Sequence, residues 1–429
     1  MRHAFVARLT IAGAVALAAL PCEAQTDSKA QQKPPAGGFR FEFEERPSFR
    51  FGDVLRLDIR VKGQGDWVGL DPDVETEEGV FDPTRARLGV EGRFLKWFEY
   101  EVEREMRDTT YRWRDVYVNV NALEEAQVKV GKFKIPFSLD QLTGTFNQDF
   151  VHRSRIATFL APARDIGIMI HGTPMGRRLG YEFGVFRQDG ENARGERDAD
   201  RSGQATVAAR VRSQPLRRLV RGPLREFTFG IATTVGDVPE GLNSLRARTV
   251  FPDVEANLFD RLYVLGRRTR VGLEGAWEPG PFSVKSEFIT VSDERRNQSI
   301  SGETLSDAIS RGWYLSGTWL VTGERKEGGV DPRREIFHRA VGAIELAIRY
   351  EQIRFASADH PAEPFSNPRA ENILQNSDRV FTTGVNWYVN RWIKIQINGI
   401  REKVEDPERS PVLGRAVFWT AVGRLQIVL

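Results

Sequence analysis

Short segments in which apolar and polar residues alternate follow one another along almost the whole chain. In the first, Leu55, Leu57, Ile59 and Val61 share one face, and charged residues stand between them. A period of two is typical of β-strands with one apolar face, so we expect an all-β fold. Sixteen segments carry the pattern: 55–62, 85–91, 98–103, 115–120, 126–131, 166–172, 179–187, 204–211, 227–235, 268–277, 282–291, 312–321, 342–350, 379–388, 392–400 and 417–429.

The connections between these segments alternate in length. Those after even-numbered strands are mostly short: Arg93–Trp97, Asn121–Glu125, Thr173–Arg178, Glu278–Pro281 and Val389–Arg391. Those after odd-numbered strands are mostly long: Gly63–Thr84, Lys132–Asp165, Gln188–Gly203, Gly236–Arg267, Ser292–Ser310, Glu351–Asp378 and Arg401–Ala416. Ser213–Glu226 and Thr322–Val341 are longer than this rule, and Arg107–Arg112 is shorter. The pattern predicts a 16-stranded antiparallel transmembrane β-barrel with short periplasmic turns and long extracellular loops. A soluble β-sandwich or propeller is the alternative, in which connection lengths have no reason to alternate.

The first 24 residues have the pattern of a signal peptide. Arg2 and Arg8 form a basic region, Leu9–Leu20 is apolar, and Cys22-Glu23-Ala24 offers small residues for cleavage. The apolar run is shorter than the roughly 20 residues of a spanning helix. We therefore predict a signal peptide at 1–24, a polar linker leading into the barrel at 25–50, and a transmembrane β-barrel at 51–429.

The composition narrows the classes of function. The formal net charge is +3, and it becomes +2 without residues 1–24, which hold two arginines and one glutamate. This balance points to no nucleic-acid partner. Cys22 is the only cysteine, and the four histidines that remain after cleavage lack metal-ligand spacing. The mean hydropathy of −0.41 excludes a helical membrane protein but not a barrel, whose strands average out as hydrophilic. We expect no enzyme, no metal and no cofactor.

Basic residues gather where a solute would pass through such a barrel. The loop after the fifth strand, Lys132–Asp165, is expected to fold inward as the third long loop. The basic residues of this loop are Lys132, Lys134, Arg153, Arg155 and Arg164, and inward strand positions add Arg56, Arg60, Lys62, Arg85, Arg87 and Lys129. Such a cluster in a narrow lumen attracts anions, and a guanidinium fits phosphate or carboxylate oxygens bidentately. The alternative is that acids neutralise these cations, because Glu99, Glu101, Glu103 and Glu105 share the inward face of the third strand.

Several short motifs occur in a characteristic order. They are Arg85-Ala-Arg-Leu-Gly-Val-Glu-Gly92 leading into Phe98-Glu-Tyr100, Gly131-Lys-Phe-Lys-Ile-Pro-Phe137, Leu160-Ala-Pro-Ala-Arg-Asp-Ile-Gly167 with His171-Gly172, Gly312-Trp-Tyr314 with Leu320-Val-Thr-Gly-Glu324, Gly342-Ala-Ile-Glu-Leu-Ala347 with Arg349-Tyr350, and Gly384-Val-Asn-Trp-Tyr388. Through them the chain resembles the phosphate-selective porin O/P family of Gram-negative outer membranes, over nearly everything after Phe51. Arg85, Asp115 and Arg153 stand where phosphate-selective members have like residues. The loop tip, Gly144-Thr-Phe-Asn147, lacks the lysine that those members place there.

The resemblance implies an outer-membrane porin, a homotrimer in contact with outer-membrane lipid, and passive diffusion of small anions, phosphate among them. We expect a porin that prefers anions. A non-selective porin, or a barrel that serves mainly as a surface interaction or structural protein, is the alternative. The expected path of the anion comprises Arg56, Arg60, Arg85, Arg87, Asp115, Lys129, Lys132, Lys134, Arg153, Arg155 and Arg164. We also expect Arg153→Ala to lower anion selectivity with little effect on folding.

Overall fold

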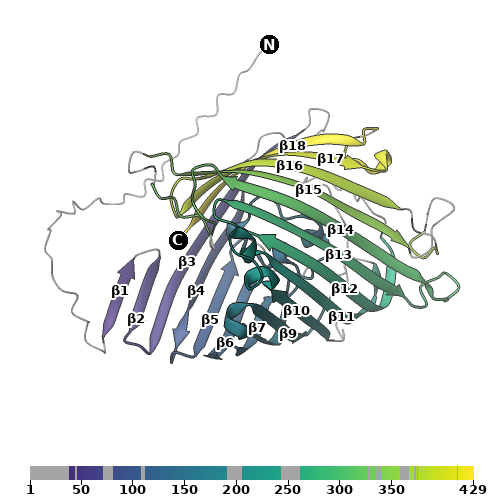
Figure 1. Ribbon diagram of the computed structural model, residues 1–429. Coiled ribbons are helices and arrows are strands. Elements are labelled where there is room, and N and C mark those ends of the chain that lie inside the picture. The colour runs from purple at the N-terminus through teal and green to yellow at the C-terminus, as the bar shows by residue number, and fades with distance from the viewer. Residues whose placement is uncertain are drawn as a thin grey trace, which may run out of the picture. The chain divides into compact units, whose positions relative to one another are not determined.

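Sixteen antiparallel strands, β3 to β18, pair in chain order and close into a barrel (Figure 1). The computed structural model describes residues 38–43, 46–70, 81–107, 112–190, 205–242, 261–326, 329–334, 336, 340–357, 367–371, 373, 375–412 and 414–429. The strands are β3 Leu55–Leu70, β4 Phe81–Phe94, β5 Phe98–Glu105, β6 Trp113–Leu123, β7 Ala126–Lys134, β8 Arg164–Gly172, β9 Leu179–Phe186, β10 Thr206–Ser213, β11 Thr228–Leu242, β12 Tyr263–Trp277, β13 Phe282–Arg295, β14 Leu305–Leu320, β15 Ala343–Ser357, β16 Asn376–Tyr388, β17 Ile393–Val404 and β18 Val417–Val428.

The barrel closes where the last strand pairs with the first. β18 runs antiparallel to β3, from Thr420 opposite Leu70 to Val428 opposite Lys62. The predicted count of sixteen strands is confirmed, and each predicted segment overlaps one strand of the barrel. The predicted signal peptide and the linker as far as residue 37 lie outside the described residues, so this division of the chain stays a prediction.

Apolar side chains cover the outside of the barrel. Along β14, Trp313, Leu315 and Trp319 are 38%, 51% and 46% exposed, whereas Tyr314 and Ser316 between them are at most 5% exposed. Successive side chains of a strand point to opposite faces, so the exposed apolar set faces outward and the polar set faces the lumen. This distribution is that of a barrel with lipid outside. Among the described residues, no helix is long and apolar enough to cross a membrane.

A hairpin that the sequence analysis missed extends the wall beside β3. Its strands are β1 (Phe39–Phe43) and β2 (Pro47–Phe51), and β2 pairs with β3 from Ser48 opposite Asp58 to Phe51 opposite Leu55. The hairpin therefore occupies the part of the β3 edge that β18 leaves open. One of its faces carries phenylalanines, with the rings of Phe39 and Phe51 5.1 Å apart. The other face carries Arg40, Glu42, Ser48 and Arg50.

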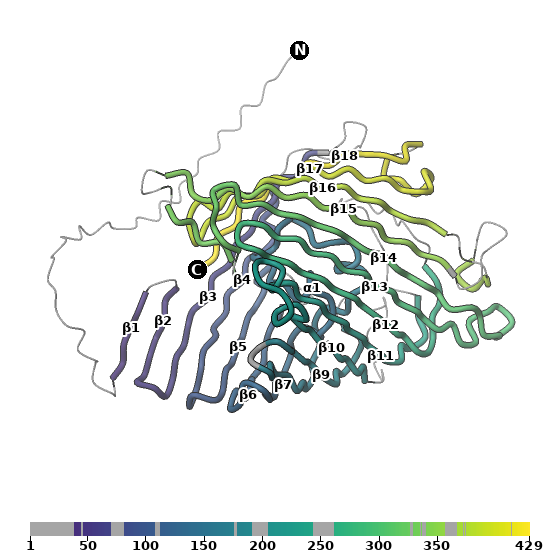
Figure 2. Tube along the Cα trace, in the orientation of Figure 1, coloured from purple at the N-terminus to yellow at the C-terminus, as the bar shows by residue number. Residues whose placement is uncertain are grey.

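One long connection folds into the barrel. Residues 135–163, which we call the inward loop, join β7 to β8 and contain α1 (Leu139–Leu142), the 3-10 turn η1 (Thr145–Asn147) and α2 (Arg155–Phe159) (Figure 2). Phe137, Ile156 and Leu160 of this loop are fully buried in an apolar cluster with side chains of β11, β13, β14, β15, β17 and β18. We call the end of the barrel with the short connections 95–97 and 124–125 the turn end, and the opposite end the loop end.

Candidate functional site

The inward loop begins against β13. Ser138 adopts a left-handed backbone (φ 70°) at the start of α1, and its Oγ accepts a hydrogen bond from the Gln141 amide at 3.2 Å. Glu287 of β13 accepts hydrogen bonds from the backbone amides of Leu139 and Asp140, the latter at 3.1 Å. The first amides of a helix have no partner within the helix, so this wall carboxylate satisfies them and fixes where α1 begins.

Polar side chains of the opposite wall hold the middle of the inward loop. Arg424 of β18 donates to the Val151 carbonyl at 2.7 Å and pairs with Asp66 of β3 at 2.6 Å. Gln426 of β18 donates to the Phe146 carbonyl at 2.8 Å, and Lys394 of β17 donates to the Gln148 carbonyl at 2.6 Å. Buried backbone carbonyls need such partners, so the loop follows a path that the strand side chains specify.

Helix α2 is held by a buried ion pair and by a close contact with a glycine. The Arg155 guanidinium pairs with Asp378 at 3.2 Å and with Glu402, and both carboxylates are almost fully buried. A Cβ on Gly312 of β14 would lie 2.5 Å from the Ile156 side chain and clash with the Gln352 carbonyl. Glycine at this position therefore lets α2 lie directly against the wall.

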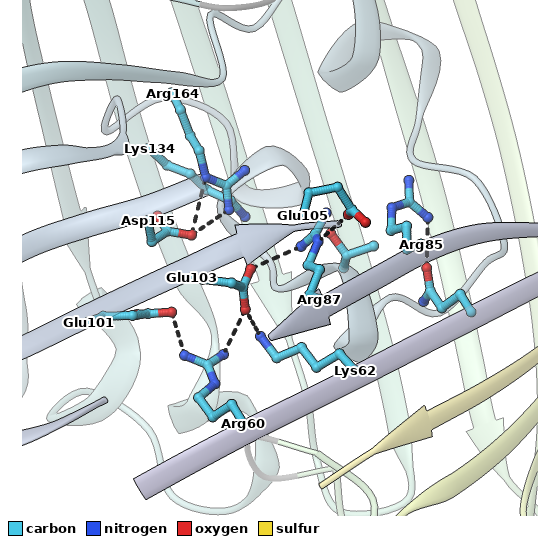
Figure 3. Close-up of polar contacts among 12 residues, drawn as sticks. Arg60, Lys62, Arg85, Arg87, Glu101, Glu103, Glu105, Asp115, Lys134 and Arg164 are labelled. Atoms are coloured by element: carbon cyan, nitrogen blue, oxygen red, sulfur yellow. Dashed lines mark hydrogen bonds and ion pairs between the residues drawn. The ribbon is translucent and has the colours of Figure 1, made fainter. Parts of the chain in front are cut away.

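A ladder of ion pairs covers the inner face of β3, β4 and β5 (Figure 3). Glu103 lies at its centre and faces three cations: Lys62, Arg87 at 3.3 Å and Arg60 at 3.7 Å. Arg60 also pairs with Glu91 at 2.6 Å and with Glu101. Arg87 also pairs with Glu105 at 2.8 Å. The acidic face of β5 thus neutralises much of the basic face of β3 and β4.

Two cations near the tip of the inward loop bind backbone carbonyls rather than carboxylates. Lys134 Nζ donates to the carbonyls of Gln141, Leu142 and Thr143 at 2.7–3.1 Å. Arg153 donates to the Asp140 carbonyl and to the Thr143 carbonyl, the latter at 2.7 Å. Carbonyls carry only partial charge, so both cations keep most of their positive field.

A cavity of about 640 Å³ separates the tip of the inward loop from the ladder. We call it the eyelet. Leu142 and Gly144 to Asn147 of the loop line one side, and side chains of β3 to β9 line the other. The lining contains eight basic residues, Arg46, Arg60, Lys62, Arg87, Lys129, Lys134, Arg164 and Arg391, and five acidic ones, Glu101, Glu103, Asp115, Glu182 and Asp331. Burial and the neighbouring Arg424 lower the pKa of His152, on the same loop, well below its ordinary value, so His152 adds no charge. Basic side chains of the lining thus outnumber acidic ones by three.

The sequence pattern of the family described as "Phosphate-selective porin O and P" matches residues 58–426, which is almost the whole barrel. The chain belongs to this family. Together with the closed barrel, this identifies the protein as an outer-membrane porin channel.

Individual relatives are more distant. Porin O of Pseudomonas aeruginosa is 27% identical over 138 residues, which are 31% of this chain and 30% of that protein. The alignment thus spans less than a third of the relative. A trimer form of OmpT, an outer membrane protein of Vibrio cholerae, superimposes with a TM-score of 0.54 at 10% identity and covers 88% of this chain and all of that one. The outer membrane channel DcaP of Acinetobacter baumannii gives 0.53 at 8% identity, with 88% and 98% covered. At such low sequence identities, these similarities show a shared fold and nothing more.

Most of the predicted path residues of this porin meet around the eyelet. Arg60, Arg87, Lys129, Lys134 and Arg164 line it, and so does Asp115, which pairs with Arg164 at 2.6 Å. Arg85 is oriented by the Gln64 side chain, to which it donates at 2.7 Å, and interacts electrostatically with Arg87 and Arg153. Whether these residues contact a passing anion stays a prediction.

Four predicted residues have other positions in the porin. Arg56 lies at the turn end beside a second cavity of about 720 Å³ and pairs with Asp58 at 2.8 Å. Arg155 is buried against the far wall, and Arg153 is occupied by loop carbonyls. Lys132 is opposite Ile166, whose side chain is exposed outside the barrel. Cross-strand partners point to the same face, so placing Lys132 in the inward loop was wrong: β7 continues to Lys134, and Lys132 faces outward.

The sequence analysis missed two cations of the eyelet. Arg46, between β1 and β2, reaches Glu91 of β4. Arg391, in the turn before β17, lies 3.5 Å from Asp331 and over the ring of Trp392. The alternation of Phe39, Arg40, Phe41 and Glu42 could have revealed the hairpin, but no signal in the sequence directs a turn residue such as Arg391 into the lumen.

Proposed function

We propose that this porin lets small hydrophilic solutes diffuse passively through the eyelet and prefers anions to cations. The observation that carries the proposal is the excess of basic over acidic residues in the eyelet lining. In a narrow aqueous passage between low-dielectric walls, fixed charge of one sign raises the local concentration of the opposite ion. The assigned role is transport, without catalysis.

The preference is expected to be moderate and to extend to anions in general. The guanidinium groups of Arg60 and Arg87 already pair with carboxylates, and that of Arg153 donates to loop carbonyls. A phosphate would have to displace these partners before it could bind bidentately. The tip residues Gly144 to Asn147 supply no further cation. Phosphate therefore passes as one anion among others.

We further propose that the porin assembles as a homotrimer in the outer membrane. OmpT of Vibrio cholerae, which shares the fold, has a trimer form. The apolar outer face of strands such as β14 suits both lipid and a neighbouring copy. Cross-linking in native membranes, followed by gel electrophoresis, tests this assembly. A chain that still migrates only as a monomer after cross-linking would contradict it.

Reversal potentials in planar bilayers test the selectivity. With a tenfold KCl gradient, we expect stepwise conductance and a potential whose sign favours chloride over potassium. A potential that favours potassium would show that the acids of β5 outweigh the cations and would refute anion preference. Folded protein that inserts without any conductance would instead favour a surface interaction role.

A further inference from the structure

Lys129 differs from the other cations of the eyelet. Among the described residues, Lys129 Nζ has no carboxylate, carbonyl or amide partner. It lies 4.4 Å from the centroid of the Tyr117 ring and 5.6 Å from that of Phe133. Cation–π contacts of this kind orient an ammonium but leave its N–H groups available for an acceptor.

The acids near Lys129 are already engaged with other cations. Those that interact with it electrostatically include Glu182, Asp115 and Glu101. Glu182 pairs with Arg210 at 2.9 Å. Asp115 pairs with Arg164, and Glu101 with Arg60. Among the described residues, Lys129 therefore has no carboxylate at contact distance, and unlike Lys134 on the same strand it binds no backbone carbonyl either.

Apolar groups surround this ammonium. Phe133 and Met169 are buried in a cluster of the wall against which Tyr117 packs. Leu142 and Phe146 of the inward loop line the eyelet opposite this wall. Thus a single available cation stands between an aromatic wall and an apolar loop tip.

We propose that Lys129, Tyr117 and Leu142 form a subsite for monocarboxylates that carry an aromatic ring. The carboxylate would accept hydrogen bonds from Lys129 Nζ, and the ring would lie between Tyr117 and the loop tip. Phosphate suits this place poorly because its strongly hydrated oxygens need several donors, and an apolar rim supplies none. A ring gains from the same rim, both by burial and by contact with Tyr117.

Block of the chloride current tests this subsite. The current of single channels in KCl is measured with benzoate, acetate or inorganic phosphate added at equal concentration. In the unaltered porin we expect benzoate to halve the current at a concentration about tenfold below that of acetate, because acetate accepts the same hydrogen bond but lacks the ring that Tyr117 and the loop tip would bury. Phosphate should also need about the tenfold higher concentration, because it too lacks the ring. Loss of the charge-assisted hydrogen bond from Lys129 Nζ should weaken carboxylate binding about tenfold or more, so Lys129→Met should raise the benzoate concentration that halves the current by that factor.

Matched variants separate the subsite from a general effect. Lys132→Met removes a lysine from the outer face of the same strand and should leave the block by benzoate unchanged. Lys129→Gln keeps a polar group and serves if Lys129→Met fails to insert. Tyr117→Leu should weaken the block by benzoate more than that by acetate. Equal block by phosphate and benzoate, or an undiminished benzoate block in both Lys129 variants, would overturn the subsite.

Because the subsite lies on the path of the proposed function, the two need separate readouts. Reversal potentials without benzoate report on anion preference alone. A channel that prefers potassium but loses its benzoate block in Lys129→Met would retain the subsite and lose the proposed function. A channel that prefers chloride and does not distinguish benzoate from acetate would retain the function and lose the subsite.

Discussion

Glu103→Gln changes the charge of the eyelet by one unit at the centre of the ladder. Glu103 is almost fully buried and faces Lys62, Arg87 and Arg60. Glutamine keeps an oxygen that can accept from Lys62 and has nearly the same volume. The variant should therefore fold, and the excess of basic over acidic side chains in the lining should rise from three to four.

The expected change in selectivity follows from Coulomb's law. A unit charge about 6 Å from a passing ion contributes about 0.7 kcal/mol in water, and screening at 0.1 M salt reduces this to about 0.4 kcal/mol. That energy raises the local anion concentration about twofold and lowers that of cations by the same factor. The permeability ratio of chloride to potassium should therefore increase about fourfold.

Reversal potentials in 0.1 M salt measure this ratio, and 1 M salt should largely abolish the difference. Glu294→Gln is the control, because it removes a carboxylate at the loop end that pairs with Arg296 at 2.8 Å. Its ratio should stay close to that of the unaltered porin. A Glu103→Gln ratio that is unchanged or lower would show that ions do not pass along the ladder.

Three further variants test the anchors of the inward loop. Arg153→Ala frees the loop tip and should raise open-channel current noise and conductance; lower anion selectivity with unchanged noise would show that Arg153 acts only on ions. Arg155→Met leaves two buried carboxylates without their cation and should lower the free energy of unfolding by about 3–5 kcal/mol, measured by thermal circular dichroism in detergent. Arg409→Met, which removes a surface pair in a neighbouring loop, should lower it by less than about 1 kcal/mol, and equal effects would contradict a structural role for Arg155. Gly312→Ala should push α2 away from the wall, lower the free energy of unfolding by about 1–3 kcal/mol and alter conductance. Gly317→Ala is the control, because Gly317 is on the outer face and its new Cβ would be 3.8 Å from its nearest neighbour. It should change neither the free energy of unfolding nor the conductance.

The strands could be predicted because lipid on one side and water on the other impose a period of two. The pattern fails where the strands extend beyond that environment. For example, β14 begins at Leu305, seven residues before the predicted segment. The prediction missed these residues because the sequence from Leu305 to Arg311 does not alternate. The β1–β2 hairpin was missed because each of its strands has only five residues.

Only those site residues that lie on strands with alternating apolar and polar positions could be predicted from the sequence. Alternation correctly turned Arg60, Arg87 and Lys129 inward, and the same rule, applied to Lys132, would have turned it outward. The inward loop has no period, so its contacts could not be predicted. Whether Arg153 faces a solute or the Thr143 carbonyl depends on a fold of the loop that side chains from distant strands determine.

The inward loop also braces the barrel across its diameter. Its backbone and side chains are tied to Glu287 of β13, to Asp378 and Glu402 of β16 and β17, and to Arg424 of β18. A hollow cylinder of strands flattens easily under lateral pressure from the bilayer, whereas one with an internal strut resists a change of cross-section. The width of the eyelet then depends on these contacts between the inward loop and the wall rather than on the loops at the ends of the barrel. Outer loops can therefore vary in length and sequence without changing the sieving dimension of the channel.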